Sequence, residues 1–93
     1  MATFVMLATL TPEGVRTVKS NPQRINDVSR EVEQLGVSMS QQSAALGMVD
    51  FLSLVEAPDE RAVLRLTVEL GSRGTARYRS LAAIPIDGFI ASL

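Results

Sequence analysis

Hydrophobic residues along the chain follow two periods, which predict four strands and two helices. Runs that are apolar throughout or alternate with polar residues are typical of strands, and apolar residues three or four apart are typical of helices. The predicted strands cover 4–10, 37–45, 51–57 and 75–83, the predicted helices cover 12–35 and 58–70, and a short apolar tail follows over 84–90.

The strands 4–10 and 51–57 are apolar on both faces, which indicates central strands that are covered on both sides. The order β-α-β-β-α-β predicts an α+β, ferredoxin-like antiparallel sheet with two helices on one face. Helices on one face leave the other face apolar and open, and such a surface marks an interface. We therefore expect a homo-oligomer, a dimer or higher, in which a partner subunit covers the open face as in dimeric α/β barrels.

Two local expectations follow from the same pattern. The apolar stripe of 12–35 keeps its phase across Pro22, so we expect one helix with a kink or brief break near 20–22. Strict alternation in 37–45 places Met39, Gln41 and Ser43 on one face of that strand.

Composition narrows the chemistry. Ninety-three residues with 46% hydrophobic and 20% charged residues fit one globular domain over 1–93. The chain has no cysteine and no histidine, which removes thiol nucleophiles, the usual base near pH 7 and the commonest metal ligand, so we expect no cofactor and no metal. A net charge of −1 gives no basic surface for nucleic acid. Without a signal peptide or an apolar run that spans a membrane, the expected location is the cytoplasm.

Several segments in order along the chain resemble the GYD-domain family of small bacterial proteins. They are Met1–Leu7, Gly47-x-x-Asp50-Phe51, Val55–Asp59, Glu69–Thr75 and Ala83–Pro85. The resemblance implies a ferredoxin-like fold of the dimeric α/β-barrel type, and it brings no assigned reaction. Val49 stands where the family motif has its tyrosine, so a role that needs a phenol there is lost or moved in this chain.

Three residues are candidates for proton transfer. Asp50 follows the turn glycine and would act as a base at a pocket mouth, or it would bond turn amides and fix the hairpin register. Glu56 lies late in an apolar strand and would act as an acid, or it would be solvated or paired. Tyr78 is the only tyrosine and would donate a hydrogen bond in a pocket, or it would be a buried core residue.

Three arginines are candidates for binding an anionic ligand. Arg77 and Arg79 share one face of the last strand and would clamp a carboxylate or phosphate, or they would form a solvated or subunit-bridging face. Arg73 lies in a loop between two glycines, Gly71 and Gly74. It would bind an anion, or it would bond loop carbonyls.

Three functions stay open from the sequence. The first is a non-catalytic homo-oligomeric module that binds a small apolar ligand. The second is a cofactor-independent enzyme, of the monooxygenase, isomerase or cyclase type, that acts on a small aromatic or polyketide-like substrate; this rests on fold analogy alone. The third is a regulatory module that binds another protein through an exposed strand edge.

Overall fold

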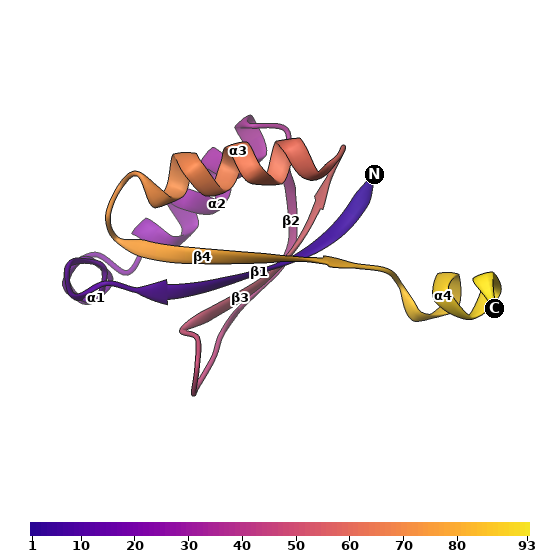
Figure 1. The fold of residues 1–93 in the computed structure, drawn as a ribbon. Coiled ribbons are helices and arrows are strands. Elements are labelled where there is room, and N and C mark those ends of the chain that lie inside the picture. Colours follow the sequence, from indigo (N-terminus) through magenta and orange to yellow (C-terminus); the bar gives the residue numbers. More distant parts are fainter.

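The computed structural model describes residues 1–93 as one four-stranded sheet and four helices. In chain order the elements are β1 (Ala2–Leu10), α1 (Pro12–Ser20), α2 (Arg24–Gln34), β2 (Ser38–Ala44), β3 (Phe51–Ala57), α3 (Glu60–Gly71), β4 (Ala76–Ala83) and α4 (Ile86–Ser92). The sheet is antiparallel with strand order β2-β3-β1-β4. Helices α2 and α3 lie together over one face of this sheet (Figure 1). The predicted α+β ferredoxin-like fold is confirmed.

The core lies between the sheet and the helices. From the strands it receives the side chains of one face, such as Phe4 and Met6 on β1 and Val55 on β3. From the helices it receives Val32 on α2 and Leu66 on α3, which are both fully buried. Helix α3 begins because the Asp59 carboxylate accepts a hydrogen bond from the amide of Ala62 at 3.0 Å, which caps one free donor of the first turn.

The break expected near 20–22 is present over 21–23, and it divides the region 12–35 into the separate helices α1 and α2. Helix α1 ends at Ser20, and the amide of Asn21 donates to the carbonyl of Thr17 in a non-helical conformation. Pro22 follows, and it has no amide with which to continue the helix. In Figure 1 the chain resumes as α2 in a different direction, since α1 is seen end-on and α2 along its length. The spacing of apolar residues therefore continues in phase across the break, although the helix axis changes direction.

A bulge in β2 overturns the predicted alternation of this strand. Met39 pairs with Val55 and Gln41 pairs with Leu54, so Ser40 is an extra residue between the two pairs. The extra residue turns the later side chains over. Gln42, which pairs with Ser53, consequently lies on the helix-covered face, while Gln41 lies on the opposite face.

The face of the sheet away from the helices carries a continuous apolar surface, which we call the open face. Val5 on β1 pairs with Leu54 on β3 and with Leu81 on β4, and Leu7 pairs with Leu52. These five side chains are only half-buried or exposed in the single chain. At the margins of the same face lie polar groups, of which Glu56 accepts a hydrogen bond from Thr3 at 2.7 Å.

The last ten residues, 84–93, form an apolar arm that leaves the end of β4. In Figure 1 this arm, with α4, extends away from the sheet and the other helices. Its large hydrophobic side chains are all exposed; they are Ile84, Ile86, Phe89, Ile90 and Leu93. The predicted apolar tail thus contains α4, a helix of seven residues with no buried side chain.

Gly14 lets α1 approach the loop before β4. A Cβ atom at this position would lie 1.9 Å from the backbone carbonyl oxygen of Thr75, which is far inside contact distance. The same carbonyl accepts a hydrogen bond from the amide of Thr11 at 3.0 Å, so it is held in place. Helix α1 can therefore lie against the sheet end only with glycine here.

We expect Gly14→Ala to lower the free energy of unfolding by about 1–3 kcal/mol, because α1 must move off the carbonyl of Thr75. Chemical denaturation followed by circular dichroism measures this change. Gly71→Ala is the matched control: nothing lies within 4 Å of its added Cβ, so it should be neutral or stabilising by up to about 1 kcal/mol. Equal effects of the two substitutions would contradict the close approach.

Candidate functional site

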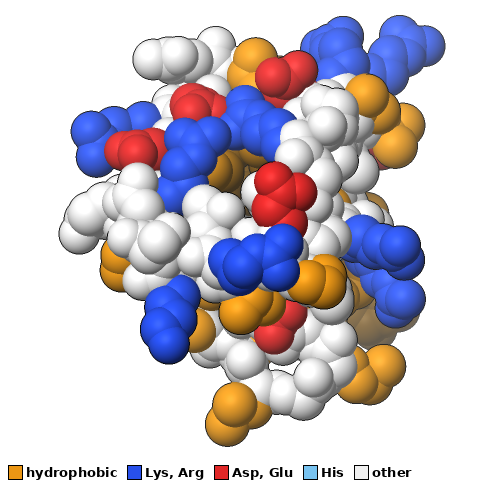
Figure 2. Space-filling view, turned by 90° about the vertical axis from the view of Figure 1, so that its left-hand side faces the viewer, with side chains coloured by type: hydrophobic (Ala, Val, Ile, Leu, Met, Phe, Trp, Pro, Cys, Tyr) orange, Lys and Arg blue, Asp and Glu red, His pale blue; other side chains and the backbone are white.

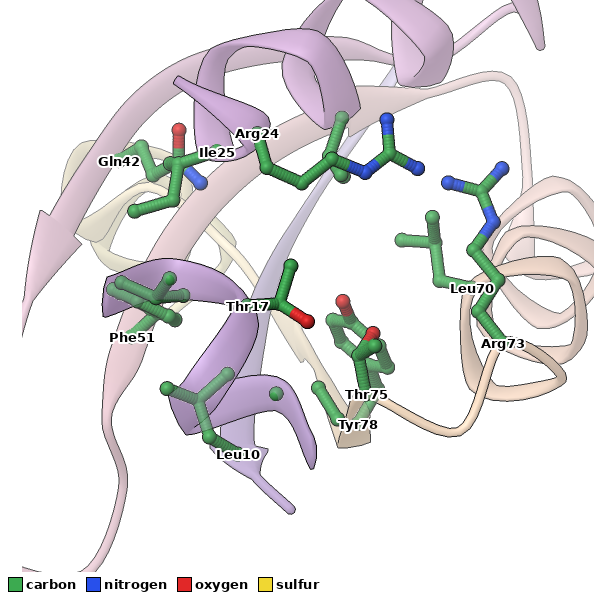
Figure 3. A pocket seen from close by; sticks show the side chains of 14 residues that line it. Leu10, Thr17, Arg24, Ile25, Gln42, Phe51, Leu70, Arg73, Thr75 and Tyr78 are labelled. Carbon is green, nitrogen blue, oxygen red and sulfur yellow. The ribbon is translucent and has the colours of Figure 1, made fainter. Parts of the chain in front are cut away.

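A pocket of about 110 Å³ lies between the helices and the end of the sheet where β1 finishes (Figure 3). Residues from both layers and from the α3–β4 loop line it, and most of them are apolar. The lining residues are Leu10, Gly14, Thr17, Val18, Arg24, Ile25, Val28, Gln42, Phe51, Leu70, Arg73, Thr75, Ala76 and Tyr78. A smaller cavity of about 40 Å³ adjoins it, and the two share Val28, Phe51 and Tyr78 among their walls.

Two arginines from distant parts of the chain meet at one end of this pocket. Figure 3 shows the guanidinium groups of Arg24, on α2, and Arg73, after α3, pointing toward one another. Glu31 bridges them: its Oε1 lies 3.0 Å from Nη1 of Arg24, and its Oε2 contacts Nη1 of Arg73. Glu69 adds a longer contact of 3.5 Å to Nη2 of Arg73. Glu31 itself is not among the residues that line the pocket.

The bridge changes the protonation equilibria of both partners. Hydrogen bonds from Arg73 and then from Arg24 hold the pKa of Glu31 below its ordinary value, so this carboxylate stays ionised. Burial disfavours the charged form of Arg73, but Glu31 and Glu69 outweigh this effect, and the pKa of Arg73 is raised. Figure 2, which views the α1 end of the molecule, shows basic and acidic side chains interspersed on this face with hydrophobic atoms between them.

Tyr78 points from β4 into the pocket, on the helix-covered face of the sheet. Burial raises the pKa of its phenol, an effect that the charge of Arg73 partly offsets. The hydroxyl is therefore neutral at pH 7 and able to donate a hydrogen bond. No side-chain or backbone group of the chain forms a hydrogen bond with it.

Of the six residues proposed from the sequence, the structure brings only Tyr78 and Arg73 together in the pocket. Arg77 and Arg79 lie on the open face, where they pair in register with Thr9 and Leu7 of β1. Glu56 also lies on the open face, at its other end, next to Thr3. These groups are separated from the pocket by the sheet itself.

Asp50 connects the β2–β3 hairpin to the end of β1. Its Oδ2 accepts a hydrogen bond from the amide of Leu10 at 2.8 Å, and its own amide donates to the carbonyl of Ala8 at 2.8 Å. Its carbonyl accepts from the amide of Ala45, also at 2.8 Å. The role is structural, but the carboxylate bonds an amide of β1 and not the turn amides considered from the sequence; Asp50 does not line the pocket.

Sequence reasoning missed Arg24, Glu31 and Gln42 as pocket-forming or pocket-supporting residues. In the sequence, Arg24 and Glu31 look like ordinary surface charges of an amphipathic helix. Their separation of seven residues was the one available signal, because it places them on the same helix face. Gln42 was out of reach, because the bulge at Ser40 reverses the face that alternation predicts. Nothing in the sequence connects Arg24 with Arg73.

Comparison with known proteins places the chain among relatives. The model of the GYD domain matches residues 4–93. The chain belongs to the GYD domain family. A relative from Thermus thermophilus, named glutamine synthetase and cystathionine beta-lyase binding protein, is 44% identical over 94 residues that cover 100% of this chain and 99% of the relative. The resemblance read from the residues is confirmed.

The fold of this GYD protein also matches a solved structure. The crystal structure of TTHA0845 from Thermus thermophilus superposes with a TM-score of 0.58 at 17% identity, covering 91% of this chain and 95% of that chain. At this identity the likeness supports the fold alone.

None of the GYD protein's helices is long and apolar enough to cross a membrane. No group of three or more potential metal ligands comes together in the structure.

The bridge between Glu31 and the two arginines should make stability depend on pH. Because the folded-state pKa of Glu31 is lowered, its contribution is present above the ordinary glutamate pKa of 4.5 and is lost as pH falls through the lower folded value. We expect Glu31→Gln to be less stable than the parent chain at pH 7. As the pH falls below 4.5, the stability of the variant should decrease less steeply than that of the parent chain.

Melting temperatures of both proteins across this acid range measure the effect. Glu33→Gln is the matched control, since Glu33 lies exposed on the same helix and forms no ion pair. If the melting temperatures of Glu31→Gln and Glu33→Gln depend on pH in the same way, the bridge does not stabilise the fold.

Proposed function

We propose that this GYD protein is a homodimeric protein-binding module that docks on an enzyme, with glutamine synthetase and cystathionine beta-lyase as the candidate partners. The observation that carries the proposal is the full-length relationship, at 44% identity, to a protein named for binding these two enzymes. Identity at this level over the whole chain indicates a shared fold. The partner is therefore an expectation that can be tested directly.

The surface of the single chain supports a role in binding other proteins. Thirteen large hydrophobic side chains are exposed, against twelve hydrophobic residues in the buried core. They cluster on the arm 84–93, on the β2–β3 hairpin at Leu46 and Met48, and on the outer side of α3 at Leu64 and Val68. Scattered apolar residues are normal on protein surfaces, whereas clusters of this size mark interaction sites.

A homodimer through the open face would cover a further apolar surface of the single chain. Val5, Leu7, Leu52, Leu54 and Leu81 form an apolar centre that no element of the chain covers. From the strand spacing and the rise per residue, one face of a four-stranded sheet of this length covers roughly 400 Å² as a flat area. A stable interface buries ~800 Å² per partner, so the exposed side chains of the arm would have to contribute to it as well.

A catalytic role receives less support from the geometry. The base candidates Asp50 and Glu56 do not share a cavity with Tyr78, since Asp50 is engaged in the hairpin and Glu56 lies on the other side of the sheet. The pocket has hydrogen-bond donors but no carboxylate among its lining residues. The proposed function accordingly rests on binding.

Biolayer interferometry with the immobilised GYD protein tests the partner assignment. We expect saturable binding of purified glutamine synthetase or cystathionine beta-lyase, competed by the untagged GYD protein in solution. An unrelated oligomeric enzyme of similar mass serves as the negative control. Absence of binding to both enzymes by a correctly folded sample would overturn the partner assignment.

Dimerisation is tested separately. We expect Leu54→Asp to raise the dissociation constant of the dimer by more than about hundredfold, because it places a charge in the centre of the open face, which the dimer would bury. Leu64→Asp is the matched control, since it makes the same change at an exposed position on α3 and should leave the dimer intact. Sedimentation equilibrium gives both masses. A monomeric parent protein at micromolar concentration, or an intact Leu54→Asp dimer, would rule out the open face as the interface.

A further inference from the structure

The lining of the pocket between the helices and the sheet contains hydrogen-bond donors but no carboxylate. Eight of its fourteen lining residues are hydrophobic, two are arginines, and none is aspartate or glutamate. Glu31 contacts both arginines and Glu69 contacts Arg73 from outside the lining, and these contacts occupy only part of the five N–H donors that each guanidinium carries. Donors therefore remain for a group inside the pocket.

Tyr78 adds a further donor to the pocket. Its hydroxyl points into the pocket and has no hydrogen-bond partner in the chain, so it is free to bond a group placed there. The phenol is protonated at neutral pH, and burial raises its pKa above the ordinary value. In Figure 3 the hydroxyl of Thr17 also faces this space from α1, and it already donates to the carbonyl of Glu13, so it has only acceptor capacity left.

The volume limits the size of an occupant. The main pocket measures about 110 Å³, and the adjoining cavity adds about 40 Å³. A cavity of about 150 Å³ that is lined by aliphatic and aromatic side chains accommodates benzene. The apolar walls here, which include Ile25, Val28 and Phe51, thus suit a single ring or a short branched chain.

We propose that the pocket binds a small carboxylic acid with one apolar ring or branched chain, whose carboxylate is held by Arg24, Arg73 and the hydroxyl of Tyr78. Guanidinium groups bind carboxylates through charge-assisted, often bidentate, hydrogen bonds. An amino acid is disfavoured, since no lining carboxylate would receive its ammonium group. This site goes beyond the proposed enzyme-binding function, and it lies on the side of the sheet opposite to the open face.

The probe is phenylacetate, titrated into the complete protein and followed by two-dimensional ¹H–¹⁵N NMR. We expect saturable shifts of the amides of pocket residues such as Gly14 and Ala76, with a Kd below about 1 mM. Phenylalanine, which adds an ammonium group, and 2-phenylethanol, which lacks the carboxylate, should each bind at least tenfold more weakly. Absence of saturable shifts at millimolar phenylacetate, or equal binding of either analogue, would overturn the proposal.

Tyr78→Phe separates a ligand role from a structural one. Because the hydroxyl has no partner in the chain, its removal should leave the melting temperature of the free protein unchanged and weaken phenylacetate binding by about tenfold. A lower melting temperature with unchanged binding would show that the hydroxyl serves the fold, and it would overturn its assignment to the ligand.

Arg73→Gln should weaken phenylacetate binding by at least tenfold, and Arg24→Gln provides a second test if the first variant does not fold. Arg65→Gln is the matched control, because Arg65 is exposed on α3 and forms no ion pair. Loss of binding in Arg24→Gln or Arg73→Gln but not in Arg65→Gln supports the carboxylate site. Unchanged binding in a folded arginine variant contradicts it. Neither result depends on whether glutamine synthetase binds.

Discussion

The pairing of β1 with β3 is the constraint on which the rest of this structure depends. The two strands lie at the centre of the sheet, and both carry apolar side chains on both faces. On one face Phe4, Met6 and Val55 form the core with the helices. On the other face Val5, Leu7, Leu52 and Leu54 form the centre of the open surface. One backbone ladder thus fixes both the packing of the chain and the surface that it offers to a partner.

The same arrangement divides the molecule into two functional sides. The side that faces the helices holds a small pocket with two arginines and an unpaired phenol. The open face, together with the apolar arm that extends from β4, is suited to protein contact. Because the sheet separates the two sides, the proposed ligand site and the proposed protein contact share no residues.

The bridge of Arg24, Glu31 and Arg73 illustrates how a surface ion pair acquires a structural role. Exposed pairs contribute little to stability when they are isolated. Here one carboxylate fixes two guanidinium groups, which come from α2 and from the loop after α3. It thereby ties together segments that are far apart in the chain, and it orients two cations at the end of an apolar pocket.

Local patterns in the sequence determined the elements and the fold class of this protein. The doubly apolar runs identified β1 and β3, and the order of strands and helices led to the ferredoxin-like sheet. The family was recognisable from short segments along the chain. A structural role for Asp50 was also within reach, but its carboxylate bonds the Leu10 amide of β1 and not a turn amide, a pairing that no local pattern shows.

Tertiary structure alone decided where the chain turns in space and which side chains meet. The change of direction after Pro22 leaves the hydrophobic period intact, so the sequence does not reveal it. One extra residue at Ser40 moved Gln42 to the pocket side, which strict alternation cannot anticipate. Arg24, Arg73 and Tyr78 converge only because α2, the α3–β4 loop and β4 pack at the same end of the sheet, and that proximity is a property of packing rather than of any local pattern.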